Sequence, residues 1–317
     1  MISNTSSNTP KFLPMNVAEP SFLVDRLGQD CRPEQFLREL TQNSIEAIAR
    51  TGGPGEIVWQ TVPSFFFPES RQSGRKLSIN DSGDGMTGQE LEQFINQLAS
   101  SGSQPSLGGN YGLGGKIACA SRNPAGVVYQ SWKNGEGHQV WLRRDEASRG
   151  YGLRQFPIDE ELFSYHPAVP QKYKPLIVHG HGTQVILLGR SESEDTTRAP
   201  EGIADSPTWI SKYLNSRYYC FPCGVTIRVH EGCTPCGLPG NIRTLTGMET
   251  YLNDHSVGSG VIKLTGALAH WWILEDGSHL VATTAARHLA LRSLPIVTDY
   301  CNSRDGEDKK AGSRVKL

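Results

Sequence analysis

The chain has 317 residues, of which 37% are hydrophobic and 20% charged, and its formal net charge is −1. This composition fits a globular protein of one large or two smaller domains, and the balanced charge gives no global electrostatic reason to bind nucleic acid or a membrane surface. No apolar run is long enough to span a bilayer, and the first residues lack the basic start and apolar core of a signal peptide, so we expect a cytoplasmic protein with no membrane partner.

From the N-terminus onward, the sequence predicts a mixture of helices and strands. A helix is expected over residues 33–50, because Pro33 stands near its first turn and apolar residues recur at helical spacing. The other expected helices cover residues 88–99, 206–219 and a stretch that begins at Lys116. The expected strands cover residues 56–62, 76–81, 126–132, 138–144, 182–189, 260–274 and 278–284.

Turns join several of these strands directly. The segment "KNGEG" links strands 126–132 and 138–144, and "EDGS" links strands 260–274 and 278–284. Because hairpins replace a regular alternation of strand and helix, we expect an α+β protein with a mostly antiparallel sheet.

The helix over residues 33–50 carries polar side chains on one face. Glu39 and Asn43 lie four residues apart, and Glu46 follows close to the same stripe. Taken alone, this pattern is typical of a solvated helix face.

Two glycine-rich segments follow. In "INDSGDGMT", residues 79–87, Asp81 ends a strand beside Gly83 and Gly85, which suits either a tight turn or a ligand lying against the backbone. In "GNYGLGGK", residues 109–116, glycines precede a helix N-terminus, which suits phosphate but also occurs in many surface loops.

The order of these segments resembles the GHKL ATPase superfamily, which includes DNA gyrase, the ninety-kilodalton heat-shock chaperones, histidine kinases and the mismatch-repair protein MutL. The matching segments read "ELTQNSIEA", "DSGDGMT", "GNYGLGG" and "GTQVIL", within residues 20–230. The resemblance implies the Bergerat-type ATP-binding fold, a two-layer α/β sandwich, and Mg²⁺-dependent hydrolysis of ATP.

The resemblance also implies roles for single residues. Glu39 corresponds to the general base, Asn43 to the Mg²⁺ ligand, and Glu46 to an acidic position that supports the site, with a plain surface acid as the alternative. On the adenine side, the resemblance implies that Asp81 accepts a hydrogen bond from the amino group and that Thr183 supports it. It also implies that Gly83 and Gly85 let the backbone approach the nucleotide closely and that Met86 packs against the base.

Residues 100–115 correspond to the mobile ATP lid of this superfamily. Its end and the following helix start offer backbone amides to the phosphates. Lys116 either neutralises phosphate charge or is solvated. The residues assigned to this cradle are Gly109, Gly112, Leu113, Gly114 and Gly115.

The insertion between Lys116 and Gly182 is similar to the chaperone, topoisomerase VI or MORC-type branches. The first histidine, His138, follows the lid, which disfavours a histidine kinase. In the favoured branches ATP closes the lid and promotes homodimerisation. The alternatives are a nucleotide sensor with little hydrolysis and a protein kinase of the histidine-kinase type; the client, whether protein or DNA, is not identifiable from the motifs.

The chain thus divides into an N-terminal arm, a main ATPase domain, a smaller β-rich region that resembles a transducer by position alone, and a charged tail. Their expected ranges are 1–20, 21–240, 241–301 and 302–317.

Four of the seven cysteines form two Cys-x-Pro-Cys-Gly pairs, which predict a structural zinc site with four thiolates. Nine residues separate the pairs, and one extended strand across them would hold them about 15–20 Å apart, so the chain would have to turn back there or the ion would lie between chains. Buried structural cysteines are the alternative. The residues are Cys220, Cys223, Cys233 and Cys236.

Overall fold

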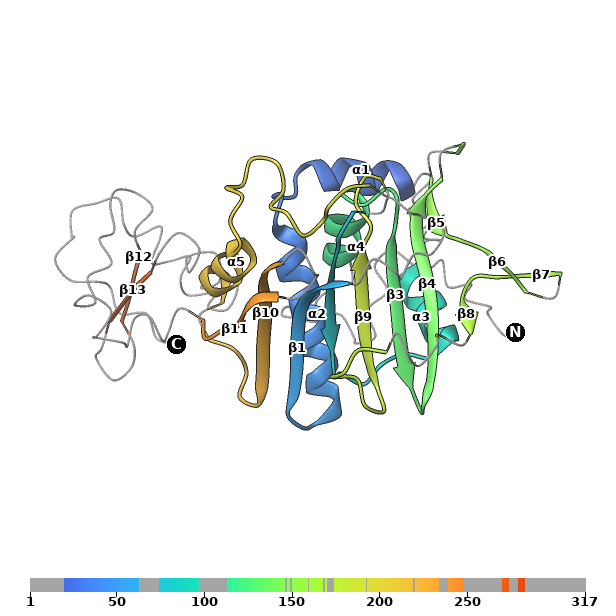
Figure 1. Ribbon diagram of the computed structural model, residues 1–317. Coiled ribbons are helices and arrows are strands. Elements are labelled where there is room, and N and C mark those ends of the chain that lie inside the picture. Colours follow the sequence, from blue (N-terminus) through green and yellow to red (C-terminus); the bar gives the residue numbers. More distant parts are fainter. Residues whose placement is uncertain are drawn as a thin grey trace, which may run out of the picture.

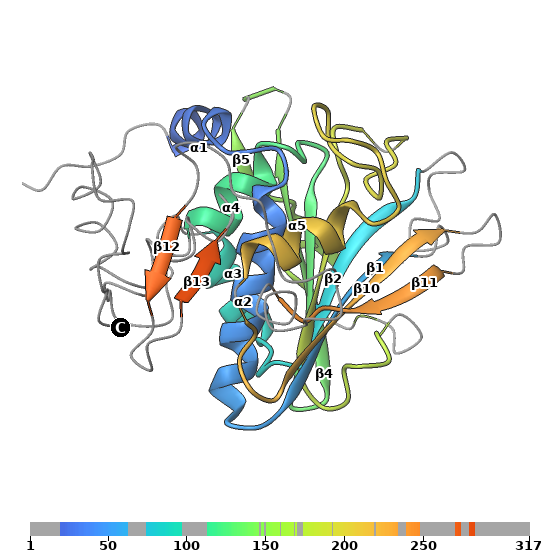
Figure 2. The ribbon, with the colours of Figure 1, turned by 90° about the vertical axis from the view of Figure 1, so that its left-hand side faces the viewer.

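A computed structural model of the chain shows a sheet covered on one face by helices (Figures 1 and 2). The structure describes residues 20–62, 74–96, 113–145, 147–148, 150–158, 160–167, 169, 174–191, 193–218, 220–233, 239–247, 270–273 and 279–282. No helix in these ranges is both long and apolar enough to cross a bilayer.

Five helices occur in the described residues: α1 (Pro20–Gln29), α2 (Gln35–Thr51), α3 (Gly88–Asn96), α4 (Leu113–Ala120) and α5 (Trp209–Arg217). The strands of the main sheet are β1 (Gly55–Val62), β2 (Lys76–Asp81), β3 (Val127–Lys133), β4 (Glu136–Arg144), β5 (Tyr151–Leu153), β8 (His166–Pro167), β9 (Gly182–Leu187), β10 (Val225–Cys233) and β11 (Pro239–Thr244). Two short pairs complete the set: β6 (Phe156–Ile158) with β7 (Glu161–Phe163), and β12 (His270–Ile273) with β13 (His279–Ala282).

The main sheet has the strand order β11-β10-β1-β2-β9-β3-β4-β5, with β8 beside β4. Within the described residues its pairings are antiparallel, except that β1 runs parallel to β10. The predicted α+β class and the predicted α/β sandwich with a mostly antiparallel sheet are therefore confirmed.

Strand alternation divides the buried apolar side chains between the two faces of the sheet. The larger core lies between the sheet and helices α1 to α5 and includes Leu37, Ile48, Trp59 and Ile79, none of which is more than 1% exposed. On the opposite face a smaller cluster joins Val62, Val128, Ile186 and Leu188.

Helix α2 is fixed against the sheet by both apolar and polar contacts. Burying Leu37 and Ile48 contributes about 1.5–3 kcal/mol each relative to exposure. Trp59 of β1 donates its indole N–H to Thr41 Oγ1 at 3.1 Å, which sets how the helix lies on the strand. Gly52 then ends the helix in the left-handed conformation, with φ of 71°.

The structure contains some elements that the sequence did not predict. Helix α1 is one of them, and so are the short strands β5 to β8 and the edge strand β11. Strand β11 extends the main sheet past residue 240, and Leu245, which is 5% exposed, belongs to the main core. The remaining predicted parts of the C-terminal region, outside β12 and β13, lie beyond the described residues.

Candidate functional site

Asp81 is the last residue of β2, and it is buried against helix α2. Its Oδ2 accepts a hydrogen bond from Ser44 Oγ at 2.9 Å, and its Oδ1 accepts one from Gly83 N at 2.9 Å. Burial raises the pKa of the Asp81 carboxyl to about 6, although the bonds from Gly83, Ser44 and the backbone of Thr183 act to lower it. An acidic group with three donors and a pKa this high is unusual for a simple turn residue.

Gly83 and Gly85 are required by the protein's own packing. A Cβ on Gly83 would lie 2.5 Å from the Cβ of Ala47 and 2.8 Å from Asp81 Oδ1. Gly85 has φ of 64°, and a Cβ there would lie 2.0 Å from the carbonyl oxygen of Trp132. The glycines therefore let the segment after β2 pass between α2 and β3.

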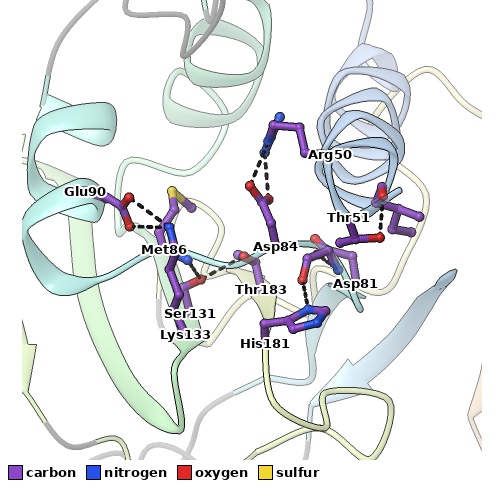
Figure 3. Close-up of polar contacts among 12 residues, drawn as sticks. Arg50, Thr51, Asp81, Asp84, Met86, Glu90, Ser131, Lys133, His181 and Thr183 are labelled. Atoms are coloured by element: carbon purple, nitrogen blue, oxygen red, sulfur yellow. Dashed lines mark hydrogen bonds and ion pairs between the residues drawn. The ribbon is translucent and has the colours of Figure 1, made fainter. Parts of the chain in front are cut away.

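Thr183 reaches this site from strand β9, where it pairs in register with Asp81. Its hydroxyl lies 2.9 Å from Ser131 Oγ, and Ser131 Oγ also accepts a bond from Met86 N at 2.8 Å (Figure 3). Met86 packs against the main core, next to this hydroxyl pair. Asp81, Met86 and Thr183 are thus brought together by neighbouring strands.

Two further contacts hold the "DSGDG" segment from outside. Arg50 at the end of α2 donates to both carboxylate oxygens of Asp84, at 2.9 and 3.0 Å. His181, just before β9, hydrogen-bonds the carbonyl oxygen of Gly83 through Nδ1, which must therefore carry the proton (Figure 3). Sequence reasoning missed both pairs.

Glu39 and Asn43 meet the start of helix α4. A Cβ on Gly114 would lie 2.3 Å from Glu39 Oε2, and one on Gly115 would lie 2.9 Å from Asn43 Nδ2. The two glycines therefore bring the backbone of α4 directly against these side chains. Glu39 itself is only 3% exposed.

Arg38 holds the Glu39 carboxylate from the same helix. Its Nη2 lies 2.6 Å from Glu39 Oε1, and the backbone carbonyl of Arg38 accepts a bond from the Tyr218 hydroxyl at 3.2 Å. Because Glu39 is buried, this ion pair is shielded from solvent on the carboxylate side, so the charge is compensated locally.

Lys116 is buried, so the interpretation that it is solvated is wrong. It is 4% exposed, its ammonium donates to the carbonyl oxygen of Phe94 in α3, and its Nζ lies 4.7 Å from the centre of the Phe94 ring. Burial lowers the Lys116 pKa to about 8. The side chain is therefore directed at α3 rather than at solvent.

The remaining predicted nucleotide residues are placed only in part. Glu46 is half-buried and accepts a bond from Gln42 Nε2 at 3.1 Å. Leu113 is the first residue of α4. Gly109, Gly112 and most of the predicted lid lie outside the described residues.

The predicted zinc site cannot form within one chain as expected. Strand β10 runs without interruption from Val225 to Cys233, which places Cys223 and Cys233 about 20 Å or more apart. Cys220 and Cys223 are exposed, and Cys236 lies outside the described residues. In the described residues no group of three or more His, Cys, Asp and Glu side chains could hold a metal ion.

Comparison with known proteins gives one partial likeness. No protein-family model matches the chain. The chaperone protein HtpG of Desulfotalea psychrophila is 29% identical to it over an alignment of 150 residues that covers 41% of this chain. The match covers 24% of that relative, so the chain spans about a quarter of the length of the protein it resembles.

Proposed function

We propose that this chain binds ATP together with Mg²⁺ and hydrolyses it, as the GHKL ATPases do. The observation that supports this most is that α2, which carries the first predicted motif, contacts two of the others. Its Glu39 and Asn43 meet the α4 glycines, and its Ser44 bonds Asp81. The partial likeness to a chaperone named HtpG is compatible with this class of ATPase.

At the adenine side, Asp81 acts as the acceptor for the base. Its carboxylate is already oriented by Ser44 and Gly83, and a carboxylate has lone pairs for further donors. An exocyclic amino group can donate to it, whereas the carbonyl of guanine would face it with another acceptor. Asp81 therefore favours adenine over guanine.

At the phosphate side, the residues fit a magnesium ion and the phosphates it accompanies. Asn43 offers one neutral oxygen ligand, and Mg²⁺ takes few protein ligands beside phosphates and waters. The closely packed N-terminus of α4 offers backbone N–H groups and the positive end of the helix dipole. When bound, the metal would supply Lewis-acid stabilisation of negative charge on the phosphates.

Glu39 is the group placed to accept a proton from an attacking water. It lies one helical turn from Asn43, so one face of α2 presents the metal ligand and the base together. Arg38 neutralises and orients the carboxylate. A slow turnover is expected, because the carboxylate has to leave this ion pair before it can act as a base.

Replacing Glu39 tests the proposal. We expect Glu39→Gln to lower kcat about 100-fold or more, the range for loss of a general base, while the Kd for ATP changes less than about threefold. Turnover is measured by phosphate release with Mg²⁺, and binding by calorimetry. Glu136→Gln, at the exposed first residue of β4, is the matched control and should leave both values unchanged.

A nucleotide sensor with little hydrolysis is the second candidate. The Arg38–Glu39 ion pair favours it, because Arg38 Nη2 lies 2.6 Å from Oε1 and holds the carboxylate that hydrolysis would need as a base. Tight ATP binding without phosphate release from the unmodified chain would establish the sensor and exclude the hydrolase.

We further propose that ATP promotes homodimerisation of this chain. Mass measurement by light scattering after gel filtration should show a doubling with a non-hydrolysable ATP analogue and Mg²⁺. An unchanged mass with the analogue bound would remove dimerisation from the cycle without affecting the assignment of ATP binding.

A further inference from the structure

Cys220 and Cys223 lie in a hydrogen-bonded turn directly before β10, called the knuckle below. Val225 N donates to Pro222 O at 3.1 Å, which closes the turn over the second cysteine. Gly224 has φ of 84°, a conformation that glycine adopts without strain and that turns the backbone sharply after Cys223. Both cysteine side chains are exposed, and neither is part of a disulfide.

The turn is held rigidly at both ends. Gly55 N, at the start of β1, donates to Gly224 O at 3.0 Å. On the other side Phe221 packs on Tyr218, with ring centroids 5.0 Å apart, and Tyr218 is buried against the core. Two exposed cysteines therefore lie in a turn that is tied by contacts on both sides, and such ties lower the entropic cost of binding an ion.

The described part of the same chain supplies no further ligands to this turn. Cys119 is fully buried in α4, and Cys31 is half-buried and donates its thiol to Leu27 O at 3.4 Å. Cys233 ends the far side of β10. A closed zinc site has four ligands in tetrahedral arrangement, so the turn provides half of one.

We propose that two copies of this chain share one zinc ion at this turn, with Cys220 and Cys223 of each copy as the four ligands. Each thiol releases its proton to solvent as its sulfur binds zinc. Both cysteines are exposed, so a second copy can reach them, and in a two-fold dimer the same turn of each chain would face the ion.

Zinc titration of the full chain, reduced and stripped of metal, tests this without any nucleotide. We expect a doubled mass by light scattering and about one zinc ion retained per two chains after desalting, both reversed by a chelator. Cobalt(II) in place of zinc should give the ligand-field absorption of a tetrahedral thiolate site.

Two double variants separate this site from the other cysteine pair. Cys220→Ser with Cys223→Ser should abolish both zinc retention and the dimer, whereas Cys233→Ser with Cys236→Ser should retain both. A thermal melt in chelator checks that each variant folds like the parent.

The proposal is overturned by zinc bound to a monomer, by no retained zinc, or by equal loss in the two double variants. None of these results bears on ATP binding, because no nucleotide is present. Failure of the zinc site and failure of the proposed ATPase are thus distinguishable.

Discussion

Asp81 is buried and accepts hydrogen bonds from three donors. Burial favours the protonated carboxyl and the donors favour the carboxylate. Burial outweighs the donors and raises the pKa of its carboxyl from 3.8 to about 6. Between these two values the folded protein holds a proton that the unfolded chain has lost. The contribution of this residue to stability therefore increases as pH falls from about 6 to 3.8 and is constant below that range.

Nucleotide affinity should respond to pH in the opposite direction. Protonation of Asp81 removes an acceptor for the adenine amino group, so affinity should fall below about pH 6, approaching tenfold per pH unit. Competition binding with adenosine measures this without interference from ionising phosphates. An affinity that is flat between pH 5 and 7 would contradict the role of Asp81.

Ser44 is the side-chain donor to that carboxylate, and its removal should be costly only when Asp81 is ionised. Ser44→Ala should lower the free energy of unfolding by about 1.5–3 kcal/mol at pH 7.5, the range for hydrogen bonds to charged groups. Urea unfolding at pH 7.5 and at pH 5 measures the difference. A loss of the same size at both pH values would mean that packing, not the hydrogen bond, is responsible.

At the scale of elements, the site depends on how closely α4 approaches α2. Gly114 allows contact with the buried Glu39 carboxylate, and Gly115 allows contact with Asn43. Alanine is favoured over glycine in a helix by about 1 kcal/mol, but a Cβ at 2.3 Å from Glu39 Oε2 requires one helix to move. The clash should dominate, because Glu39 is held by Arg38.

Gly114→Ala should therefore lower kcat for ATP at least about tenfold, since an ångström of misplacement is costly in catalysis. Phosphate release measures this, with Gly152→Ala as the control because a Cβ there meets nothing within 4 Å. Equal kcat in the two variants would show that the close approach of α4 is not needed for turnover.

Elements with strong periodicity could be predicted, and those without it could not. Helix α2 and the β3–β4 hairpin carry clear apolar patterns or turn residues, and both were expected. Strand β11 has no such apolar pattern. Its residues 240–244 are exposed, and it begins with Pro239 and Gly240. Helix α1 is short and contains Gly28, where close packing against Ser121 requires a glycine.

The same distinction applies to the site. Glu39, Asn43 and Asp81 could be predicted as candidates because their spacing and order resemble known motifs. Ser44, Ser131 and His181 act through contacts between segments far apart in the chain, and nothing local in the sequence indicates these partners. The cysteine pairs looked like one site because they are near in sequence, and the extended strand between them separates them.

At the scale of the whole molecule, the sheet brings distant parts of the chain together. Ser44 from α2, Asp81 from β2, Ser131 from β3 and Thr183 from β9 meet at one end of the sheet. The knuckle lies one strand beyond β1, at the strand end where Gly55 pairs with Val225. Phe221 and Tyr218 then connect the knuckle to the backbone of Arg38, beside Glu39.

The parallel pairing of β1 with β10 also has a consequence for synthesis of the protein. A ribosome that adds roughly 5–20 residues per second needs on the order of ten to thirty seconds to pass from Gly55 to Val225. During that time one edge of β1 has no native partner strand, and open edges template association between chains. A chain cut after residue 224 should therefore aggregate when expressed, whereas one cut after residue 247 should stay in the supernatant after centrifugation. Nascent chains that end between residues 224 and 247 are therefore the ones that would need chaperones in a cell.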